Sequence, residues 1–448
     1  MSSLLLVYPY FRPRVDRSQF RFPPLGLLYV AAAARAAGHD VRVLDGTFLR
    51  REEAAHLALA ARADVVGISC LSTLEDDCLG LARLLRGRCR LLVAGGPLPT
   101  CDPGRFLDDF DVVVRGEGER TVVELLAALD DGGDLAAVPG VVTRASGQRG
   151  DAPARPFEPD LDALPFPARD LLPNASYIAD GRRRKGAAVT TVMSTRGCPY
   201  ACDFCSNVVF GASYRARSAG DVADEIEQAL GLGYDRISFA DDVFTLDHDR
   251  VAAVCEEIRS RRLRFTWECL GRVDGFDARL ARLLRAAGCD RVFFGIESGV
   301  DDVLRMMNKR TSAEQSRRAV LTAHEAGLQV GAFFILCYPG ETDDTVLETL
   351  RFLTALPLDY AGLTVPYPLP GTGLYERMGE RTRLRGRGER LVTWHAVTYA
   401  GDFSPVKMRA ALLKGRLQVE MRRRLGSFGP AALRLFEPAT DALFRRLR

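Results

Sequence analysis

Short apolar runs that alternate with helical sequence constrain the fold of this 448-residue chain more than any other feature. Residues 1–145 contain five such runs, each followed by a stretch suited to a helix: LLLVYP, DVRVLD, DVVGISC, CRLLVAGG and FDVVVRGE. Strands that are apolar on both faces are typical of a parallel sheet that helices cover on both sides. We therefore predict an α/β fold that opens with a doubly wound, Rossmann-like domain over residues 1–145.

A second alternating series begins at residue 189. It contains six further runs: AVTTVMSTRG, RISFADD, FTWECLGRVD, RVFFGIES, LQVGAFFILC and YAGLTVPYP. Polar residues and glycines follow the end of every run, and this is the face on which (β/α) barrels build their active sites. We predict a partial (β/α)6 barrel of the TIM type over residues 189–384. A second open sheet is the alternative that the pattern leaves.

Two segments lack this alternation. Residues 146–188 are rich in Pro, Asp and Arg without a period, which predicts an extended linker over the domain surface. We interpret the basic run at 182–185 as part of a solvent-exposed loop. Residues 385–448 are rich in Arg and have a helical pattern, so we expect a helical C-terminal region with a basic outer face.

Bulk composition excludes several classes of protein. The net charge of +3 is small for this length, so a nucleic-acid-binding surface is not expected. The first apolar run has no basic residues before it and no cleavage site after it, and no apolar stretch reaches the length of about 18 residues that a membrane span needs. We expect a cytoplasmic protein without a membrane partner, whose eleven cysteines stay reduced.

Three cysteines, Cys198, Cys202 and Cys205, have CxxxCxxC spacing in the loop after the first predicted barrel strand. A structural zinc ion would need a fourth ligand, but the next candidates, His248 and Cys255, lie far along in helical sequence. A redox dithiol would use only the CDFC part of the motif. A [4Fe–4S] cluster with one iron free of protein ligands uses all three thiolates, and its free iron can bind a substrate. We favour the cluster.

With an aromatic residue, Phe204, before the last cysteine, this motif resembles the signature of radical S-adenosylmethionine (SAM) enzymes. The likeness continues in order along the chain through FADDVFTLD, ECLGRVD, FFGIESG, GAFFILCYPGET and TVPYPLPGTGLY. In that family the free iron binds SAM, and reductive cleavage of SAM gives a 5′-deoxyadenosyl radical that takes a hydrogen atom from a substrate. The resemblance implies the same two cofactors here.

The resemblance also implies roles for individual residues. Tyr200 and Phe204 should border the adenine of SAM. Glu297 and Ser298, at the end of the fourth barrel strand, should contact its ribose or methionine part. The other candidates at strand ends are the cofactor-binding residues Asp241 and Arg272 and the acid–base groups Glu268, Asp242, Tyr338 and Tyr367.

The N-terminal domain resembles the cobalamin-binding domain of one large branch of this family. The matching stretches are PPLGLLYVAAAARAAGHDVRVLD, ADVVGIS, VAGGPLPT, VVRGEGERTVVELL and VPGVV. The likeness implies that cobalamin lies against the glycine-rich turns at Gly95, Gly96, Gly116 and Glu117. The branch often has His after the double glycine, where this chain has Leu98, and DxHxxG is absent. The domain would then hold cobalamin without a His ligand, or keep only the fold.

Three functions follow as hypotheses. The first is cobalamin-dependent C-methylation of a small molecule, such as a natural product, an antibiotic precursor or a sugar. The second is a cobalamin-independent radical rearrangement, dehydration or deoxygenation, of the kind a diol dehydratase performs. The third is a non-catalytic metal-binding or regulatory protein that holds zinc at the three cysteines and does not cleave SAM. The two radical hypotheses imply a low-potential electron donor, either flavodoxin-like or a dedicated reductase.

Overall fold

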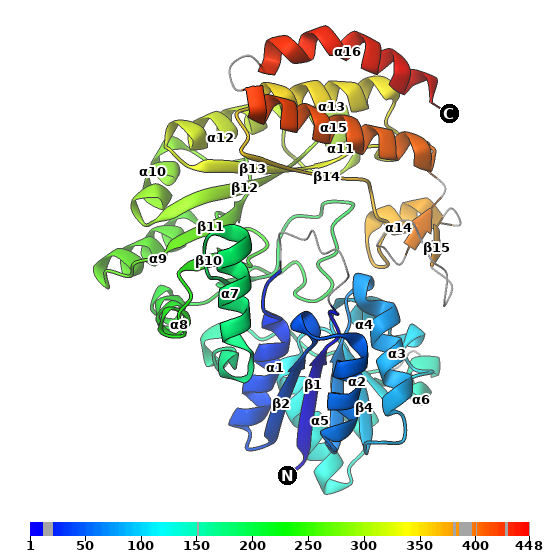
Figure 1. Ribbon diagram of the computed structural model, residues 1–448. Coiled ribbons are helices and arrows are strands. Elements are labelled where there is room, and N and C mark those ends of the chain that lie inside the picture. The colour runs from blue at the N-terminus through cyan, green and yellow to red at the C-terminus, as the bar shows by residue number, and fades with distance from the viewer. Residues whose placement is uncertain are drawn as a thin grey trace.

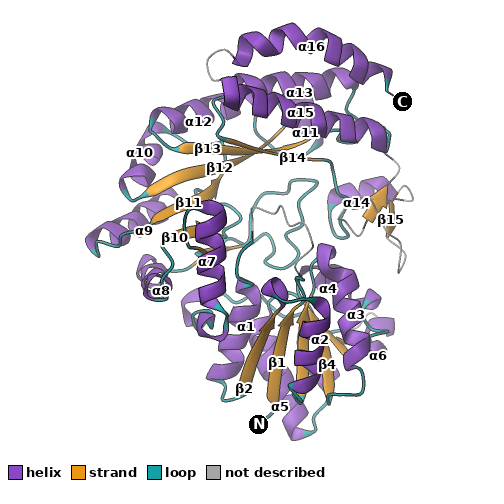
Figure 2. Cartoon of the chain, viewed as in Figure 1, coloured by secondary structure: helices purple, strands orange, loops and turns teal. Residues whose placement is uncertain are grey.

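The structure is a computed structural model that describes residues 1–11, 21–149, 152–379, 382–384, 397–399, 401–425 and 429–447. Figure 1 shows two α/β units, one formed by the N-terminal part of the chain (blue to cyan) and one by its middle part (green to yellow). Two long C-terminal helices pack on the outside of the second unit. Loops fill the space between the two sheets (Figure 2).

The first sheet has six strands in the order β2-β1-β3-β4-β5-β6. Their bounds are β1 (Ser3–Tyr8), β2 (Asp40–Asp45), β3 (Val65–Ser69), β4 (Leu91–Gly95), β5 (Val112–Val114) and β6 (Val141–Thr143). Strands β1 to β5 are parallel, which confirms the predicted doubly wound domain. The order reverses at β1, so the switch point at which such sheets bind ligands lies between β1 and β3.

Strand β6 is antiparallel to β5, so the sheet is not parallel throughout. The three-residue strand follows Gly140, whose φ of +85° allows a turn that redirects the chain. Its shortness explains why no apolar run was recognised there as a strand.

Helices cover both faces of the first sheet, as the apolar strands predict. They are α1 (Leu25–Ala36), α2 (Arg51–Ala60), α3 (Glu75–Leu85), α4 (Pro97–Cys101), α5 (Gly118–Asp131) and α6 (Arg144–Arg149). In β1, Leu4 and Leu6 belong to the core shared with α1 and α5. Leu5 and Val7 belong to the core shared with α2 and α3. Alternate residues of one strand are therefore buried in different layers.

The second sheet has the strand order β14-β13-β12-β11-β10-β7, so each strand lies next to the one before it in this series. The bounds are β7 (Val189–Val192), β10 (Arg236–Phe239), β11 (Thr266–Gly271), β12 (Cys289–Glu297), β13 (Gln329–Ile335) and β14 (Tyr360–Thr364). All pairs are parallel, and the first and last strands are not paired. This sequential winding confirms the predicted partial six-stranded barrel.

Helices pack against the outer face of the second sheet, where Trp267, Phe294 and Phe334 form part of one large core. The helices are α8 (Ala219–Gly231), α9 (His248–Ser260), α10 (Ala278–Ala286), α12 (Ala313–Glu325) and α13 (Asp343–Ala355). The short helix α11 (Asp301–Met306) packs elsewhere, because its Val303 clusters with Ile335 and Tyr338 near the end of β13. Within the ranges that the structure describes, no helix combines the length and the apolar composition that crossing a bilayer requires.

The predicted linker is not extended throughout, because α7 (Asn174–Lys185) forms within it and contains the basic run at 182–185. Tyr177 is the buried residue of this helix, and its hydroxyl donates a hydrogen bond of 2.6 Å to Asp45. A helix that buries so little shows no apolar period in its sequence, so tertiary contact decides its position.

The C-terminal part contains α14 (Gly373–Met378), α15 (Pro405–Leu425) and α16 (Gly429–Arg446). The two long helices contact each other and α13, as the helical prediction requires. A short strand, β16 (Val397–Tyr399), pairs with β15 (Thr382–Leu384), so the region is not helical throughout. The prediction for residues 385–396 lies outside the described residues.

Buried ion pairs connect the linker and the first domain to the barrel. Arg169 of the linker pairs with Glu225 of α8, and both side chains are at most 1% exposed. The second oxygen of Glu225 accepts hydrogen bonds from Arg217 and from the hydroxyl of Tyr29 in α1. A buried carboxylate with three donors from three segments fixes how these segments sit together.

We predict that Arg169→Ala destabilises the protein by about 3 kcal/mol, because it leaves the buried Glu225 carboxylate with fewer donors. The matched control is Arg35→Ala. Arg35 pairs with Asp170, the neighbour of Arg169, but the two side chains are 45% and 58% exposed, so the expected loss is below about 1 kcal/mol. Urea unfolding of both variants measures the difference, and equal losses would contradict the prediction.

Candidate active site

The three cysteines of the signature lie in one loop between two short strands. Strands β8 (Thr195–Arg196) and β9 (Arg215–Ala216) pair in antiparallel fashion, and residues 197–214 between them form what we call the cysteine loop. Asp241, at the end of β10, accepts hydrogen bonds from the backbone N–H of Ser194 (2.6 Å) and of Thr195 (3.1 Å). Its carboxylate is fully buried, so its contacts position the start of the loop.

A second set of contacts holds the middle of the cysteine loop against the barrel. The backbone N–H of Asp203 donates to the carbonyl of Met307 (2.9 Å). The Asp203 carboxylate accepts hydrogen bonds from the hydroxyl of Tyr338 (2.7 Å) and from Arg377 (2.6 Å). Tyr338, predicted as an acid–base candidate, is thus a buried anchor of the loop. Desolvation and Asp203 raise its pKa far above the usual range of tyrosine.

The three thiols lie close enough together for their charges to affect the pKa values of Cys198 and Cys205. Desolvation, followed by the nearby Cys202 and Cys198, raises the pKa of Cys205 to about 12. Two cations oppose this effect: Lys309 lowers the pKa of Cys205 and Arg272 lowers that of Cys198. Three neighbouring thiols become thiolates together only beside a centre of high positive charge, such as a metal.

Within the described ranges, no three His, Cys, Asp or Glu side chains converge on a point that would hold a single metal ion. A four-iron cluster requires a different arrangement, because each thiolate binds a separate iron atom. Three thiols spread along one loop fit that requirement. The cysteine loop therefore has the donor set for a cluster with one iron free of protein ligands.

The structure brings four predicted residues together beside this loop. The Cζ atom of Arg272 lies 3.5 Å from the centre of the Tyr200 ring. Glu297 accepts a hydrogen bond of 2.9 Å from Lys309, whose Nζ lies 5.8 Å from the centre of the Phe204 ring. The side chains of Glu297 and Lys309 are at most 9% exposed. A buried opposite-charge pair and two aromatic rings suit a zwitterionic ligand with an aromatic base, as SAM is.

Lys309 was not recognised from the sequence. It lies in the turn after α11, between Asn308 and Arg310, which both have positive φ. Glu297 and Cys337, at the ends of β12 and β13, also have positive φ. Non-glycine residues in this region are uncommon and gather at functional sites. Side-chain chemistry in the sequence does not reveal such backbone strain.

Two predicted residues lie elsewhere. Ser298 is fully buried, and its hydroxyl contacts Thr349 of α13 at 2.9 Å, so it faces the helix layer and not the cysteine loop. Glu268 is the third residue of β11, and not at the strand end as predicted. It pairs with Arg236 (2.9 Å) and Arg291 (3.4 Å) at the beginnings of the neighbouring strands, which is the opposite end of the sheet.

The remaining acid–base candidates differ in position. Asp242 follows β10, and although part of the residue is exposed, its carboxylate lies against the cysteine loop and accepts a hydrogen bond from the backbone of Gly197. Desolvation and the adjacent Asp241 raise its pKa. Tyr367 is half-buried beyond β14 and bonds to Thr364. Of the predicted acid–base pair Asp242 and Glu268, only Asp242 lies beside the cysteines.

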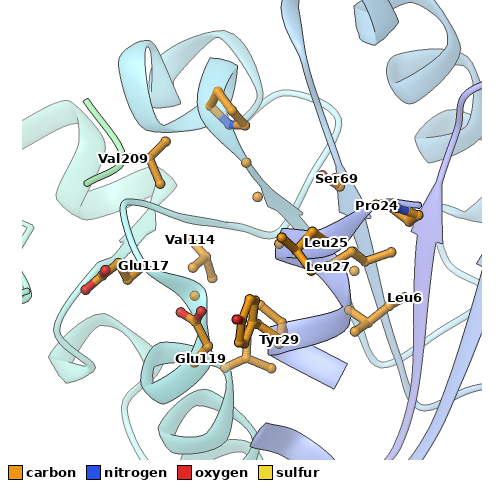
Figure 3. A pocket seen from close by; sticks show the side chains of 18 of the residues that line it. Leu6, Pro24, Leu25, Leu27, Tyr29, Ser69, Val114, Glu117, Glu119 and Val209 are labelled. Atoms are coloured by element: carbon orange, nitrogen blue, oxygen red, sulfur yellow. The ribbon is translucent and has the colours of Figure 1, made fainter. Parts of the chain in front are cut away.

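A cavity of about 350 Å³ lies between the first domain and the cysteine loop. Figure 3 shows side chains that line it, among them Leu6 and Val114 from the first sheet and Val209 from the cysteine loop. The cavity borders the ends of β1 and β3, which is the switch point of the sheet. Gly67 in the middle of β3 keeps this face open, because a Cβ there would lie 2.8 Å from Leu6.

The predicted glycines lie at this cavity. Gly95, Gly96 and Gly116 line it, and the space around Gly95 is open. Gly96 has φ of +102°, and a Cβ there would lie 3.0 Å from the carbonyl of Cys70. An apolar, glycine-walled cavity fits part of a large cofactor such as cobalamin, which shape and backbone contacts would hold.

Two further residues explain what kind of contact this cavity offers. Leu98, where the branch often has His, is buried in the core on the α2 and α3 side. The turn therefore offers no side-chain ligand at that position. Glu117, predicted to bind cofactor, accepts hydrogen bonds from Arg196 (3.0 Å) and Arg215 (2.9 Å) of the barrel domain. Its carboxylate belongs to the contact between the domains.

Replacing any one of Cys198, Cys202 and Cys205 with Ala should strongly lower the iron and sulfide content after anaerobic reconstitution, because each thiolate binds its own iron atom. Cys101→Ala is the matched control. Its sulfur lies 3.9 Å from the hydroxyl of Ser206, beside the loop but outside the motif, and the variant should retain wild-type iron. A cysteine-loop variant with full iron content would contradict the assignment.

Gly95→Leu should weaken binding of hydroxocobalamin by at least about tenfold, because its side chain would occupy the open space of the cavity. Gly80→Leu, on α3 on the other side of the sheet, also points into open space and should bind like the wild type. Equilibrium dialysis measures both affinities. Equal binding by the two variants would show that cobalamin does not use this cavity.

Comparison with known proteins identifies the same two domains. The family model of the radical SAM superfamily matches residues 192–353, and that of the B12-binding domain matches residues 12–126. An uncharacterized methyltransferase of Pyrococcus horikoshii is 35% identical over 79% of this chain and 78% of its own length. An anaerobic magnesium-protoporphyrin IX monomethyl ester cyclase of Rubrivivax gelatinosus is 28% identical over 85% of this chain and 71% of its own.

Among solved structures, the radical SAM methyltransferase TsrM of Kitasatospora setae, with cobalamin and a [4Fe–4S] cluster bound, has the same fold. The TM-score is 0.71 at 23% identity, over 86% of this chain and 80% of TsrM. The two family models match the two domains in the order in which they occur along the chain. The alignment with the 35% identical relative covers 79% of this chain and 78% of the relative. The chain therefore belongs to the radical SAM enzymes that carry an N-terminal B12-binding domain.

Proposed function

We propose that this enzyme is a cobalamin-dependent methyltransferase that adds a methyl group to a carbon atom of a small organic molecule. Membership of the family brings a [4Fe–4S] cluster, SAM and cobalamin. The observation that carries the proposal is that one loop serves both sites: residues 197–214 contain the three cysteines and also Val209 and Phe210, which line the cavity of the B12-binding domain. Two sites that share a loop suit a reaction that uses both cofactors on one substrate.

Cys198, Cys202 and Cys205 would hold the cluster, and the glycine-walled cavity would hold part of cobalamin. When bound, the cluster supplies the electron that cleaves SAM, and cobalamin carries the methyl group. The cations Arg272 and Lys309 suit the carboxylate of SAM, and Glu297 suits its ammonium group or ribose hydroxyls. The apolar sides of Tyr200 and Phe204 offer surfaces for the adenine and exclude water from it.

Asp242 is the candidate for moving a proton at this face. Its carboxylate lies next to the cysteine loop, and desolvation favours its protonated form. Glu268 has no such role in this proposal, because two arginines compensate its charge at the other end of the sheet. The cluster also needs a low-potential electron donor, for which a flavodoxin-like protein or a dedicated reductase is the expected partner, in a cytoplasmic setting.

The cyclase among the relatives supports a second candidate, a radical reaction on a small molecule without methyl transfer. Rearrangement, dehydration and deoxygenation belong to this class. The same residues would hold the cluster and SAM. The two candidates differ in whether a methyl group from SAM is transferred to the substrate.

Anaerobic reconstitution with iron, sulfide and hydroxocobalamin, followed by reduction and addition of methyl-labelled SAM, distinguishes them. We expect about four iron atoms per chain, bound cobalamin, and two products, 5′-deoxyadenosine and S-adenosylhomocysteine, with label transferred to cobalamin. Formation of 5′-deoxyadenosine alone, with no bound cobalamin, would favour the second candidate. Absence of both products would contradict each of them.

A further inference from the structure

Four charged residues are buried together where the two domains meet. Arg196 donates to Glu117 (3.0 Å) and to Glu119 (2.6 Å), and Arg215 donates to Glu117 (2.9 Å). None of these four side chains is more than 8% exposed. We call Glu117, Glu119, Arg196 and Arg215 the interdomain clamp. Its members come from both domains, so it can form only when the domains are in contact.

The two halves of the clamp have distinct places in the fold. Glu117 and Glu119 lie at the start of α5, directly after the turn at Gly116, where the helix dipole favours acidic side chains. Arg196 and Arg215 are register partners in the β8–β9 pair. These strands enter and leave the cysteine loop. The start of one helix in the B12-binding domain therefore holds both ends of the loop that carries the thiols.

The clamp also touches the wall of the cavity. The Cζ atom of Arg196 lies 5.1 Å from the ring centres of Tyr29 and Phe210. The Nη2 atom of Arg215 donates to the backbone carbonyl of Phe210 (3.1 Å). Tyr29, Phe210, Glu117, Glu119 and Arg196 all line the cavity. The clamp therefore connects the ends of the cysteine loop to residues that line the cavity.

The chemistry of the clamp suits positioning more than stability. Taking charges out of water costs free energy that their attraction offsets only with good geometry, so buried ion pairs add little net stability. The guanidinium group of Arg is planar and presents a rigid fork of donors. Arg196 uses two nitrogens of that fork to bridge two glutamates. A lysine, with a single nitrogen on a flexible stem, does not reproduce this bridge.

We propose that the interdomain clamp couples the two cofactor sites, so that binding of the cluster to the cysteine loop tightens binding of cobalamin in the cavity. The cluster would order the loop, and the clamp would transmit that order to Phe210 and the cavity wall. Coupling of this kind is reciprocal, so cobalamin stabilises the cluster to the same extent. This inference rests on the proposed function, which uses both cofactors. Glu117, Glu119, Arg196 and Arg215 are positioning residues, because they act through the loop.

Calorimetric titration with hydroxocobalamin under anaerobic conditions tests the coupling. The dissociation constant is measured for the full chain with the cluster reconstituted and with the iron removed by a chelator. In the wild type we expect cobalamin to bind at least about fivefold more tightly when the cluster is present, the lower end of coupling between linked sites. A ratio of one would overturn the inference.

Arg196→Lys and Glu117→Gln should bring this ratio towards one. A purely structural role would weaken both dissociation constants by the same factor and leave their ratio unchanged. The matched control is Glu124→Gln, on the same helix α5, where the exposed Glu124 pairs with Arg155 of the linker and not with the cysteine loop. The control should keep the wild-type ratio. Retention of the full ratio in both clamp variants would contradict the role of the clamp.

Other negative results of these titrations lead to different conclusions. If the wild type binds no cobalamin in either state, the proposed function fails, whereas equal binding in both states refutes only the coupling. Circular dichroism checks the fold of each variant. Should Arg196→Lys not fold, Glu117→Gln and the milder Glu119→Gln decide the role of the clamp, and the wild-type ratio decides the coupling.

Discussion

The two candidate cofactor sites of this protein depend on the parallel arrangement of the strands in its two sheets. In a parallel sheet the carboxyl ends of all strands meet at one edge, so the loops that follow them gather there. In the first sheet the strand ends and these loops contain the glycines at the cavity, and in the second the loops contain the cysteines and Asp242, while Glu297 is the last residue of β12. Buried ion pairs such as Arg169–Glu225 hold the linker to the barrel.

The two sites differ in the kind of surface that they offer a ligand. The cavity of the first domain is lined mainly by apolar side chains and small residues, and Gly67 and Gly95 leave room where a side chain would fill it. The barrel side uses opposite charges at short distance, as between Glu297 and Lys309, next to aromatic rings. The first arrangement suits a bulky group held by shape, and the second suits a small zwitterion held by charge.

The sequence predicts much of this architecture because long strands that are apolar on both faces have few alternatives. It does not predict β6, which is short, or α7, whose position depends on the burial of Tyr177 against Asp45. The cysteine motif can be recognised in the sequence because its spacing is local. The roles of Lys309 and Glu119 cannot be recognised in this way, because their partners lie 12 and 77 positions away along the chain.

Two residues show why strand-end motifs mislead at the level of single side chains. Glu268 and Ser298 both occur in stretches that match the family, but a shift of one or two residues along a strand changes the end or the face at which a side chain lies. Glu268 therefore pairs with arginines at the beginnings of strands, and Ser298 contacts α13. Glu117 matches its motif too, yet its carboxylate pairs with Arg196 and Arg215.

The central claim is that three thiolates hold a cluster whose fourth iron is free to bind SAM. Electron paramagnetic resonance of the anaerobically reconstituted, dithionite-reduced protein tests it most directly. The account predicts the signal of a reduced [4Fe–4S] cluster, with g values that shift when SAM is added, because SAM becomes a ligand of the free iron. A protein that shows no such signal, or a signal that SAM leaves unchanged, would contradict it.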